Sequence, residues 1–211
     1  MRKLLTLPGM ALVSLLTMGA AASPAGEIAL PEAEPWDVDV PHTEINFSVK
    51  HFFTPVTGSF GDYDIELMFD AEQPENSTVR VSIDVASVNT KNERRDNHLR
   101  SPDFFNAEQF PKMIFESTSV RAAGEHTLLA TGDLTIKGIT REVELAIDLL
   151  GIMDLPPEMQ EMLGGVTQVA SFHATTKVDR REFEVGVANW AQTVIVGGDV
   201  EISIALEANR K

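Results

Sequence analysis

Five histidines are the residues of this chain best suited to chemistry. They are His42, His51, His98, His126 and His173. No two of them share the i, i+2 or i, i+4 spacing that would present two imidazoles to one metal ion. We therefore expect no metal site, although a closed sheet can bring distant histidines together. A single imidazole can still donate a hydrogen bond or carry a proton.

The usual sequence signals of catalysis are missing. The chain has no cysteine, no G-x-S-x-G motif, no phosphate-binding loop and no H-E-x-x-H motif. Its carboxylates fall mainly at turns and on the polar side of alternating segments, where acids usually only solvate a surface. The sequence therefore predicts a protein that is not an enzyme and that needs no cofactor.

A short run of arginines is the second group with chemical potential. Arg94, Arg95 and Arg100 lie close together in a chain whose formal net charge is -15. Guanidinium groups bind carboxylates and phosphates through paired hydrogen bonds. These arginines and His51 are therefore candidate contacts for the head group of a ligand. The alternative is that the arginines pair with neighbouring acids, which are Glu93, Asp96 and Asp103.

Strands are the elements that must position these residues. After Trp36, apolar and polar residues alternate with a period of two in eight segments, at 45–49, 63–69, 79–85, 115–120, 128–136, 143–149, 169–178 and 200–206. Turn-forming residues fall at 57–58, 74–77, 123–125, 137–138, 164–165 and 197–198. Short connections favour antiparallel neighbours, and closing the sheet removes both exposed edges. We therefore predict an all-β fold, an eight-stranded antiparallel barrel with short helical segments between strands.

Two stretches interrupt the alternation. In 91–105, the pair Ser101-Pro102 is typical of a helix start. Four apolar residues near that pair predict a cover over one barrel end, or a plug inside it: Leu99, Phe104, Phe105 and Phe110. In 151–165, apolar spacing predicts a short amphipathic helix from about Pro156 to Leu163. Its side chains form a hypothetical lid: Leu155, Met159, Met162 and Leu163.

The N-terminal residues predict that the chain is exported. Residues 1–22 combine a basic start, an apolar run and small residues, which is typical of a cleavable signal peptide. We expect 23–35 to be a flexible segment and 36–209 to form one domain. Loss of Arg2 and Lys3 with the peptide takes the formal charge from -15 to -17, which disfavours nucleic acid and anionic membranes. The expected location is the periplasm, with no stable membrane insertion after cleavage.

Several segments together are recognisable as a family pattern. They are WDVD at 36–39, HTEINFSVKH at 42–51, GSF at 58–60, SVNT at 87–90, RDNHLRSPDFF at 95–105, FPKMIFEST at 110–118, GDLTIKG at 132–138 and DRREF at 179–183. Together they resemble the YceI-like family of lipocalin-like secreted bacterial proteins. The resemblance runs from Trp36 to about Ala208. The chain departs from the family at the methionine-rich connection 151–165 and at Glu184, where glycine is expected.

The resemblance implies a lipocalin-like barrel with a long cavity for an amphiphilic chain of the isoprenoid-quinone or fatty-acid type. Alternation alone leaves open whether the barrel is hollow or filled by its own side chains. Small inward side chains at Ser117, Ala174 and Thr176 favour the cavity. Its lining is predicted to include Leu99, Phe104, Phe105 and Phe110 together with the inward residues Phe47, Val49, His51, Tyr63, Ile65, Leu67, Ile83, Phe115, Ser117, Leu134, Ile136, Ile147, Phe172, Ala174 and Ile202.

Three functions follow from these expectations. The first is a periplasmic binding or carrier protein for an amphiphile, since each buried CH₂ group contributes about 0.8 kcal/mol. The second is an enzyme in which His51 or His173 moves protons on a bound amphiphile. The third is a filled barrel whose acidic exterior binds a basic partner. A homodimer and a membrane-protein partner both stay open.

Overall fold

A computed structural model describes residues 33–192 and 194–211. The signal peptide predicted at 1–22 lies outside the described residues, as does most of the segment predicted to be flexible. The end of that segment differs from the prediction, because Ala33 is buried and the first strand begins at Glu34. No helix in the described part of the chain is long and apolar enough to cross a bilayer.

The described residues form strands, two α-helices and several 3-10 turns. The strands are β1 (Glu34–Val38), β2 (Glu44–His51), β3 (Thr54–Phe60), β4 (Tyr63–Phe69), β5 (Thr78–Asp84), β6 (Val88–Asn89), β7 (Lys112–Ala122), β8 (Thr127–Ile136), β9 (Ile139–Asp154), β10 (Gln168–Asp179) and β11 (Val196–Arg210). The α-helices are α1 (Glu93–Arg100) and α2 (Pro157–Met162). The 3-10 turns are η1 (Val40–His42), η2 (Pro74–Asn76), η3 (Val85–Ser87), η4 (Arg180–Phe183) and η5 (Ala188–Trp190).

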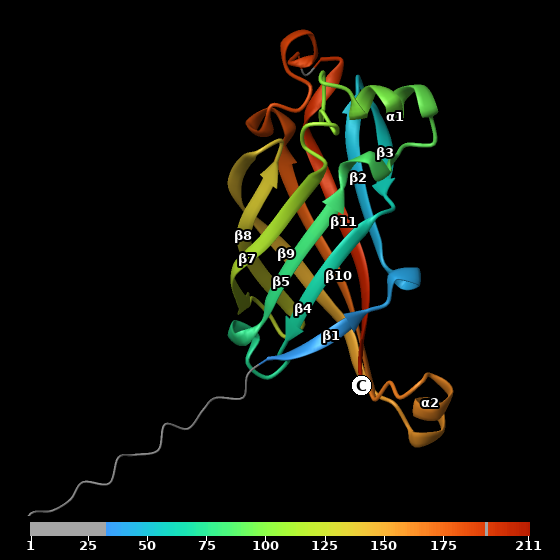
Figure 1. The fold of residues 1–211 in the computed structure, drawn as a ribbon. Coiled ribbons are helices and arrows are strands. Elements are labelled where there is room, and N and C mark those ends of the chain that lie inside the picture. Colours follow the sequence, from blue (N-terminus) through green and yellow to red (C-terminus); the bar gives the residue numbers. More distant parts are fainter. Residues whose placement is uncertain (1–32, 193) are drawn as a thin grey trace, which may run out of the picture. The chain divides into compact units, whose positions relative to one another are not determined.

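The strands close into the predicted eight-stranded antiparallel barrel (Figure 1). The ring is completed by β1, which pairs with both β4 and β11. Three of the ring positions are each shared by two strands that meet at a bend. These pairs are β1 with β2 at η1, β3 with β4 at 61–62, and β5 with β6 at η3. Each bend lets the chain change its pairing partner without leaving the ring.

Period-two alternation separates the inner face of the barrel from the outer face, as the sequence predicts. On β11, Val200, Ile202 and Ile204 pack against the buried core, whereas Glu201 between them is exposed. Successive side chains of a strand point to opposite faces, so this pattern buries one face of each strand. Burial of that apolar face is the main source of stability in a chain without disulfides.

The turn predicted at 57–58 is wrong, because both residues lie inside β3 and pair with β2. A Cβ atom on Gly58 would lie 2.4 Å from Cζ of Phe47. Glycine is needed here because an aromatic ring of the neighbouring strand rests on the backbone. Within a strand, glycine often marks such a close approach instead of a turn.

The turn predicted at 197–198 is also wrong, since both glycines belong to β11. The register between β11 and β2 shifts between Val196 and Val200, so the glycines occupy a bulge. A Cβ atom on Gly198 would lie 3.1 Å from the Arg181 side chain. Gly198 therefore leaves room for the Arg181 side chain against the strand.

The first interruption forms a helix earlier than predicted. α1 begins after Asn92, whose side-chain oxygen accepts a hydrogen bond from the backbone N–H of Arg95 at 3.1 Å. Ser101, the predicted start, follows the last helical residue, and its hydroxyl donates to the carbonyl of His98 at 2.7 Å. The helix ends there because the residue before a proline is disfavoured in the helical conformation.

The second interruption contains the predicted short helix, α2, at Pro157–Met162. Strand β9 runs further than the sequence indicates, to Asp154, and pairs there with β10. Gly164 and Gly165 follow α2 with positive φ, as is common after a helix end.

Candidate binding site inside the barrel

Two apolar cavities lie inside the barrel. We call the end that carries α1 the upper end, and the end that carries β1 and α2 the lower end (Figure 1). The upper cavity has a volume of about 140 Å³ and the lower cavity about 70 Å³. The wall surface exposed in both cavities is wholly apolar. Such surfaces bind hydrocarbon in preference to water.

The upper cavity contains the larger share of the predicted lining. Nine predicted residues border it, from β2, β5, β8, β11 and the α1 region: Phe47, Val49, Ile83, Leu99, Phe104, Phe105, Leu134, Ile136 and Ile202. The three from the α1 region close the cavity at the upper end. The apolar cover predicted from the sequence therefore contacts the cavity directly.

The lower cavity is bordered by five further predicted residues, from β4, β9 and β10. They are Ile65, Leu67, Ile147, Phe172 and Ala174. The ring of Phe172 packs edge-on against Phe69, with centroids 5.0 Å apart. Both rings of this pair border the lower cavity.

Phe115 lies at the level between the two cavities. Phe115 is buried and borders neither cavity. Its pairing partner on β5 is Val81, which borders the lower cavity. Two residues along β5, Ile83 borders the upper cavity. A Cβ atom on Gly132 would lie 2.6 Å from Cζ of Phe115. The ring is thus held over a glycine of β8 and forms part of the wall between the cavities.

Four predicted lining residues lie elsewhere: His51, Tyr63, Phe110 and Ser117. His51 is exposed at the end of β2. The hydroxyl of Tyr63 donates to the carbonyl of Thr43 at 2.6 Å, and the hydroxyl of Ser117 accepts from the N–H of Val79 at 2.9 Å. Phe110 contacts the turn at Gly138. Strict alternation misplaces these residues because it ignores strand ends and bulges.

Arg180 was missed as a site residue, although it borders the upper cavity and is 5% exposed. Its guanidinium carries five N–H donors. They are taken by the backbone carbonyls of Val185, Gly186, Trp190, Val196 and Gly197. Burial lowers the pKa of Arg180, and the neighbouring carboxylate of Asp179 opposes this effect. Because the carbonyls engage all its donors, Arg180 holds the upper end together and offers none to a head group.

Phe183, three residues later, is fully buried and borders the same cavity. The only sequence signal for both residues is the DRREF segment that contributes to the family resemblance.

The candidate head-group arginines lie on and around α1. Arg95 donates to the side-chain oxygen of Thr90 at 2.7 Å and to its carbonyl at 2.8 Å. Arg100 donates to the carbonyls of Ala86 and Val88 at 2.8 and 2.9 Å. Arg94 is exposed. Arg95 and Arg100 therefore tie α1 to β6 and η3.

The alternative that these arginines pair with nearby acids is wrong for Asp96 and Asp103. The carboxylate of Asp96 accepts from the N–H of Thr90 at 2.8 Å, and Asp103 lies 3.1 Å from Nε2 of His98. Buried polar groups need hydrogen-bond partners, and the N–H and hydroxyl of Thr90 meet this need for Asp96. His98 also packs against the rings of Phe104 and Trp190, with centroids 4.9 and 5.0 Å away.

The hypothetical lid residues border neither cavity. Leu155 is buried at the start of the connection, whereas Met159, Met162 and Leu163 are exposed. Figure 1 shows α2 on the outside of the barrel at its lower end. A lid role would therefore require α2 to move.

The histidines proposed for an enzyme also lie outside the cavities. His51 is exposed at the upper end, and Nε2 of His173 lies 2.9 Å from the hydroxyl of Ser203. Neither residue borders the upper or the lower cavity. Proton transfer to a molecule inside the barrel would need a different position for these rings.

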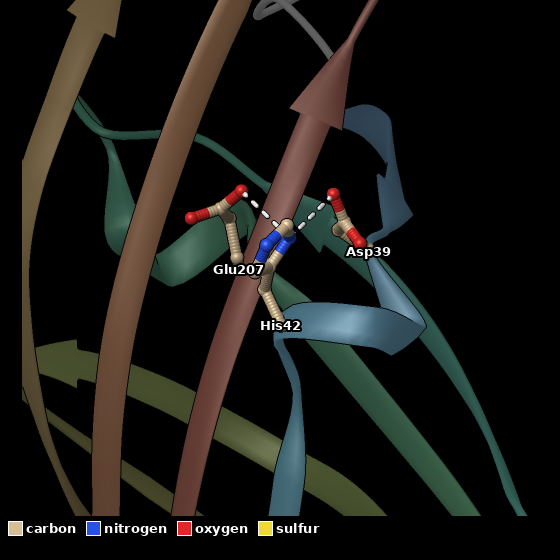
Figure 2. A group of neighbouring side chains, drawn as sticks. All are labelled: Asp39, His42 and Glu207. Carbon is tan, nitrogen blue, oxygen red and sulfur yellow. Dashed lines mark ion pairs between the residues drawn. The ribbon is translucent and has the colours of Figure 1, made fainter.

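One group of ligand-type side chains lies on the outer surface (Figure 2). His42 Nδ1 is 3.1 Å from Asp39 Oδ2 and 3.7 Å from Glu207 Oε1, and within the described residues this is the one such group of three. The hydrogen bond and charge of Asp39, with the charge of Glu207, raise the pKa of His42. A protonated imidazole balances the two carboxylates, so the geometry is that of an ion-paired contact joining η1 to β11.

Comparison with known proteins places this barrel in a family. A family model described as "YceI-like domain" matches residues 36–208. "Protein YceI" of Escherichia coli O157:H7 is 37% identical over 150 residues, which cover 71% of this chain and 74% of the relative.

Two solved structures share the fold. BcnA of Burkholderia cenocepacia superposes with a TM-score of 0.71 at 24% identity, covering 81% of this chain and 99% of BcnA. A polyisoprenoid binding domain from Saccharophagus degradans superposes with a TM-score of 0.58 at 14% identity, covering 83% of this chain and 98% of that domain. Both neighbours share the fold of the barrel described above.

Proposed function

This chain belongs to the YceI-like domain family, and on that premise we propose that it is a periplasmic carrier that holds one amphiphilic lipid, of the isoprenoid-quinone or fatty-acid type, inside its barrel. The observation that carries the proposal is the pair of wholly apolar cavities one above the other in the barrel. The polyisoprenoid-binding description of a structural neighbour supports the same ligand class.

The size of the cavities constrains how a lipid would bind. A dry apolar cavity of about 150 Å³ binds benzene, so the upper cavity, at about 140 Å³, admits a short hydrocarbon segment. Drug-sized ligands occupy sites of roughly 300–1,000 Å³. A long chain therefore enters only if side chains between the cavities move, and Phe115 is the residue placed to do so.

Once the side chains between the cavities have moved, burial of a long chain would supply enough energy for tight binding. Each CH₂ group transferred from water contributes about 0.8 kcal/mol, so fifteen buried carbons contribute roughly 12 kcal/mol before binding costs. No polar anchor is required for binding of this strength. The head group would then lie near one barrel end, where water and polar side chains are accessible.

The decisive experiment is identification of a co-purified lipid. The protein is purified from its native host, examined by native mass spectrometry, and then extracted with organic solvent. We expect one bound amphiphile per chain. A protein that carries no extractable lipid after this preparation would overturn the proposal.

A matched pair of variants locates the lipid. Ala174→Phe fills the lower cavity, whereas Thr175→Phe adds the same ring to the next residue of β10, which is exposed on the outer face. We expect the lipid content to fall in the first variant only. Unfolding midpoints close to that of the lipid-free parent exclude misfolding, and equal lipid content in both variants would contradict the site.

The periplasmic location rests on the sequence at 1–22. Cell fractionation and the intact mass of the exported protein test it directly. We expect the mature chain in the periplasmic fraction with residues 1–22 removed. An uncleaved chain in the cytoplasm would contradict this part of the proposal.

A further inference from the structure

The lower end of the barrel carries an exposed apolar surface that borders neither cavity. It comprises six side chains from the end of β9 and from the α2 region, which we call the β9–α2 surface: Leu150, Ile152, Met153, Met159, Met162 and Leu163. The most exposed are Met162 at 72% and Leu150 at 66%. Several large apolar side chains gathered in one exposed segment mark a contact site.

The strand beneath this surface has an open edge. β9 pairs with β8 only as far as Asp148, whereas it pairs with β10 as far as Asp154. Within the described part of the chain, residues 150–154 therefore have β10 on one side and no strand on the other. An open edge presents backbone N–H and C=O groups that can pair with an added strand.

The charges around the β9–α2 surface indicate which kind of partner can bind there. No Lys or Arg occurs between Arg141 and Lys177. The cations at the end of β11, Arg210 and Lys211, pair with acids of β1. Four exposed acids flank the surface: Asp148, Asp154, Glu158 and Glu161. A field of this sign repels an anionic bilayer and also a second copy of the same surface.

We propose that the β9–α2 surface binds a partner protein that presents apolar side chains flanked by Lys and Arg, and that adds a strand to the open edge of β9. The opposite charges steer the encounter and make it salt-dependent. The methionines adapt to the shape of the partner. The proposal does not depend on the lipid, because the surface and the cavities share no residue.

The test uses a synthetic peptide of alternating leucine and lysine as the probe. Its binding to the full chain is measured by isothermal titration calorimetry, with backbone amide shifts of 150–154 as a second readout. We expect saturable binding that weakens with added NaCl, and shifts concentrated at those residues. A peptide of alternating leucine and glutamate should not bind. Unsaturable binding of the lysine peptide would overturn the proposal.

Charge reversal separates a site from the general attraction of an acidic chain. Glu158→Lys with Glu161→Lys changes the lower end, and Glu182→Lys with Glu184→Lys makes the same change of net charge at η4, at the upper end. We expect affinity for the lysine peptide to fall about tenfold in the first variant, and about twofold or less in the second. Equal losses would show nonspecific attraction and overturn the proposal.

Other occupants are separate outcomes of the same study. Concentration-dependent dimers that Met162→Ser abolishes would assign the surface to a second copy of the chain, against the proposal. Cosedimentation with vesicles of anionic phospholipid, lost in Met162→Ser, would assign it to a bilayer, also against it. If the Glu158→Lys with Glu161→Lys variant fails to fold, Met162→Ser is used in the peptide test instead. We expect Met162→Ser to bind the lysine peptide more weakly than the parent does.

Discussion

At the scale of single residues, the upper end of the barrel depends on Arg180. Its guanidinium donates to backbone carbonyls of the loop after η4 and of the first residues of β11, in place of solvent. A buried carbonyl without a donor costs about 1–3 kcal/mol. Without this side chain, several backbone carbonyls next to the apolar cavity would lack a hydrogen-bond donor.

Arg180→Met is expected to lower the free energy of unfolding by about 3 kcal/mol or more, because several carbonyls lose their donors together. Urea denaturation measures the change. Arg181→Met is the control, since Arg181 is half exposed and bonds mainly to Asp179, and it should cost less than about 1 kcal/mol. Similar losses in the two variants would show that the buried network contributes little.

Asp179 makes stability depend on pH in the acid range. Hydrogen bonds from the Arg181 side chain hold the pKa of Asp179 at about 2, below the usual 3.8. A carboxyl group whose pKa is lower in the folded state than in the unfolded state stabilises the fold at pH values above its unfolded-state pKa. This stabilisation is lost as the pH falls through the folded-state pKa.

Asp179→Asn should therefore lower the free energy of unfolding by up to about 1 kcal/mol at pH 7, because the Arg181 partner is half exposed. The difference from the parent should shrink between pH 4 and pH 2. Chemical denaturation at several pH values measures it. A difference that stays constant over that range would exclude the ion pair as its cause.

At the scale of elements, two glycines let rings of neighbouring strands rest on the backbone. Gly58 of β3 lies against Phe47, and Gly132 of β8 lies against Phe115. Each glycine thereby sets how far an inward ring extends into the barrel. The division between the two cavities is consequently a property of strand pairs and not of Phe115 alone.

Gly132→Ala is expected to cost about 1–3 kcal/mol, because its Cβ would lie 2.4 Å from the carbonyl oxygen of Glu116 and would displace the Phe115 ring. Gly124→Ala is the matched control, since its Cβ would meet Thr127 at 3.6 Å, an ordinary contact. Thermal unfolding compares the two variants. Equal unfolding temperatures of the two variants would show that β8 accommodates the added Cβ atom without strain.

At the scale of the whole molecule, the barrel is closed by a chain that changes partners at its bends. β1 bridges β4 and β11 at the lower end, while β2 and β3 extend the ring at the upper end. A ligand along the axis would contact strands from every part of this ring. Its binding would stabilise the closed barrel as one unit.

Removal of the bound lipid by organic extraction and refolding should lower the unfolding temperature, and adding it back should restore that temperature. A ligand at a hundred times its dissociation constant stabilises the folded state by about 2.7 kcal/mol. Scanning calorimetry at several lipid concentrations measures the shift. An unfolding temperature that does not change with lipid concentration would contradict a binding role for the barrel.

Local sequence patterns were sufficient for eight of the strands, which are β2, β4, β5 and β7 to β11, and for which of their faces is apolar, but they missed β1, β3 and β6. Alternation on β11 and β10 depends only on residues two positions apart, and such patterns survive in any fold that buries one face. The eight-stranded antiparallel barrel and the short helix before Gly164 could therefore be predicted. The same patterns misread Gly58 and Gly197 as turns, because glycine signals a turn and a close approach alike.

Tertiary structure alone decided the space inside the barrel and the ends that close it. The volume of a cavity depends on how rings from separate strands, such as Phe47 and Phe115, pack across the axis, and alternation carries no information on depth. The carbonyls that surround Arg180 come from residues up to 17 positions away, and β9 has an open edge only because β8 ends first. Contacts of this kind depend on distances in space, which the order of residues does not specify.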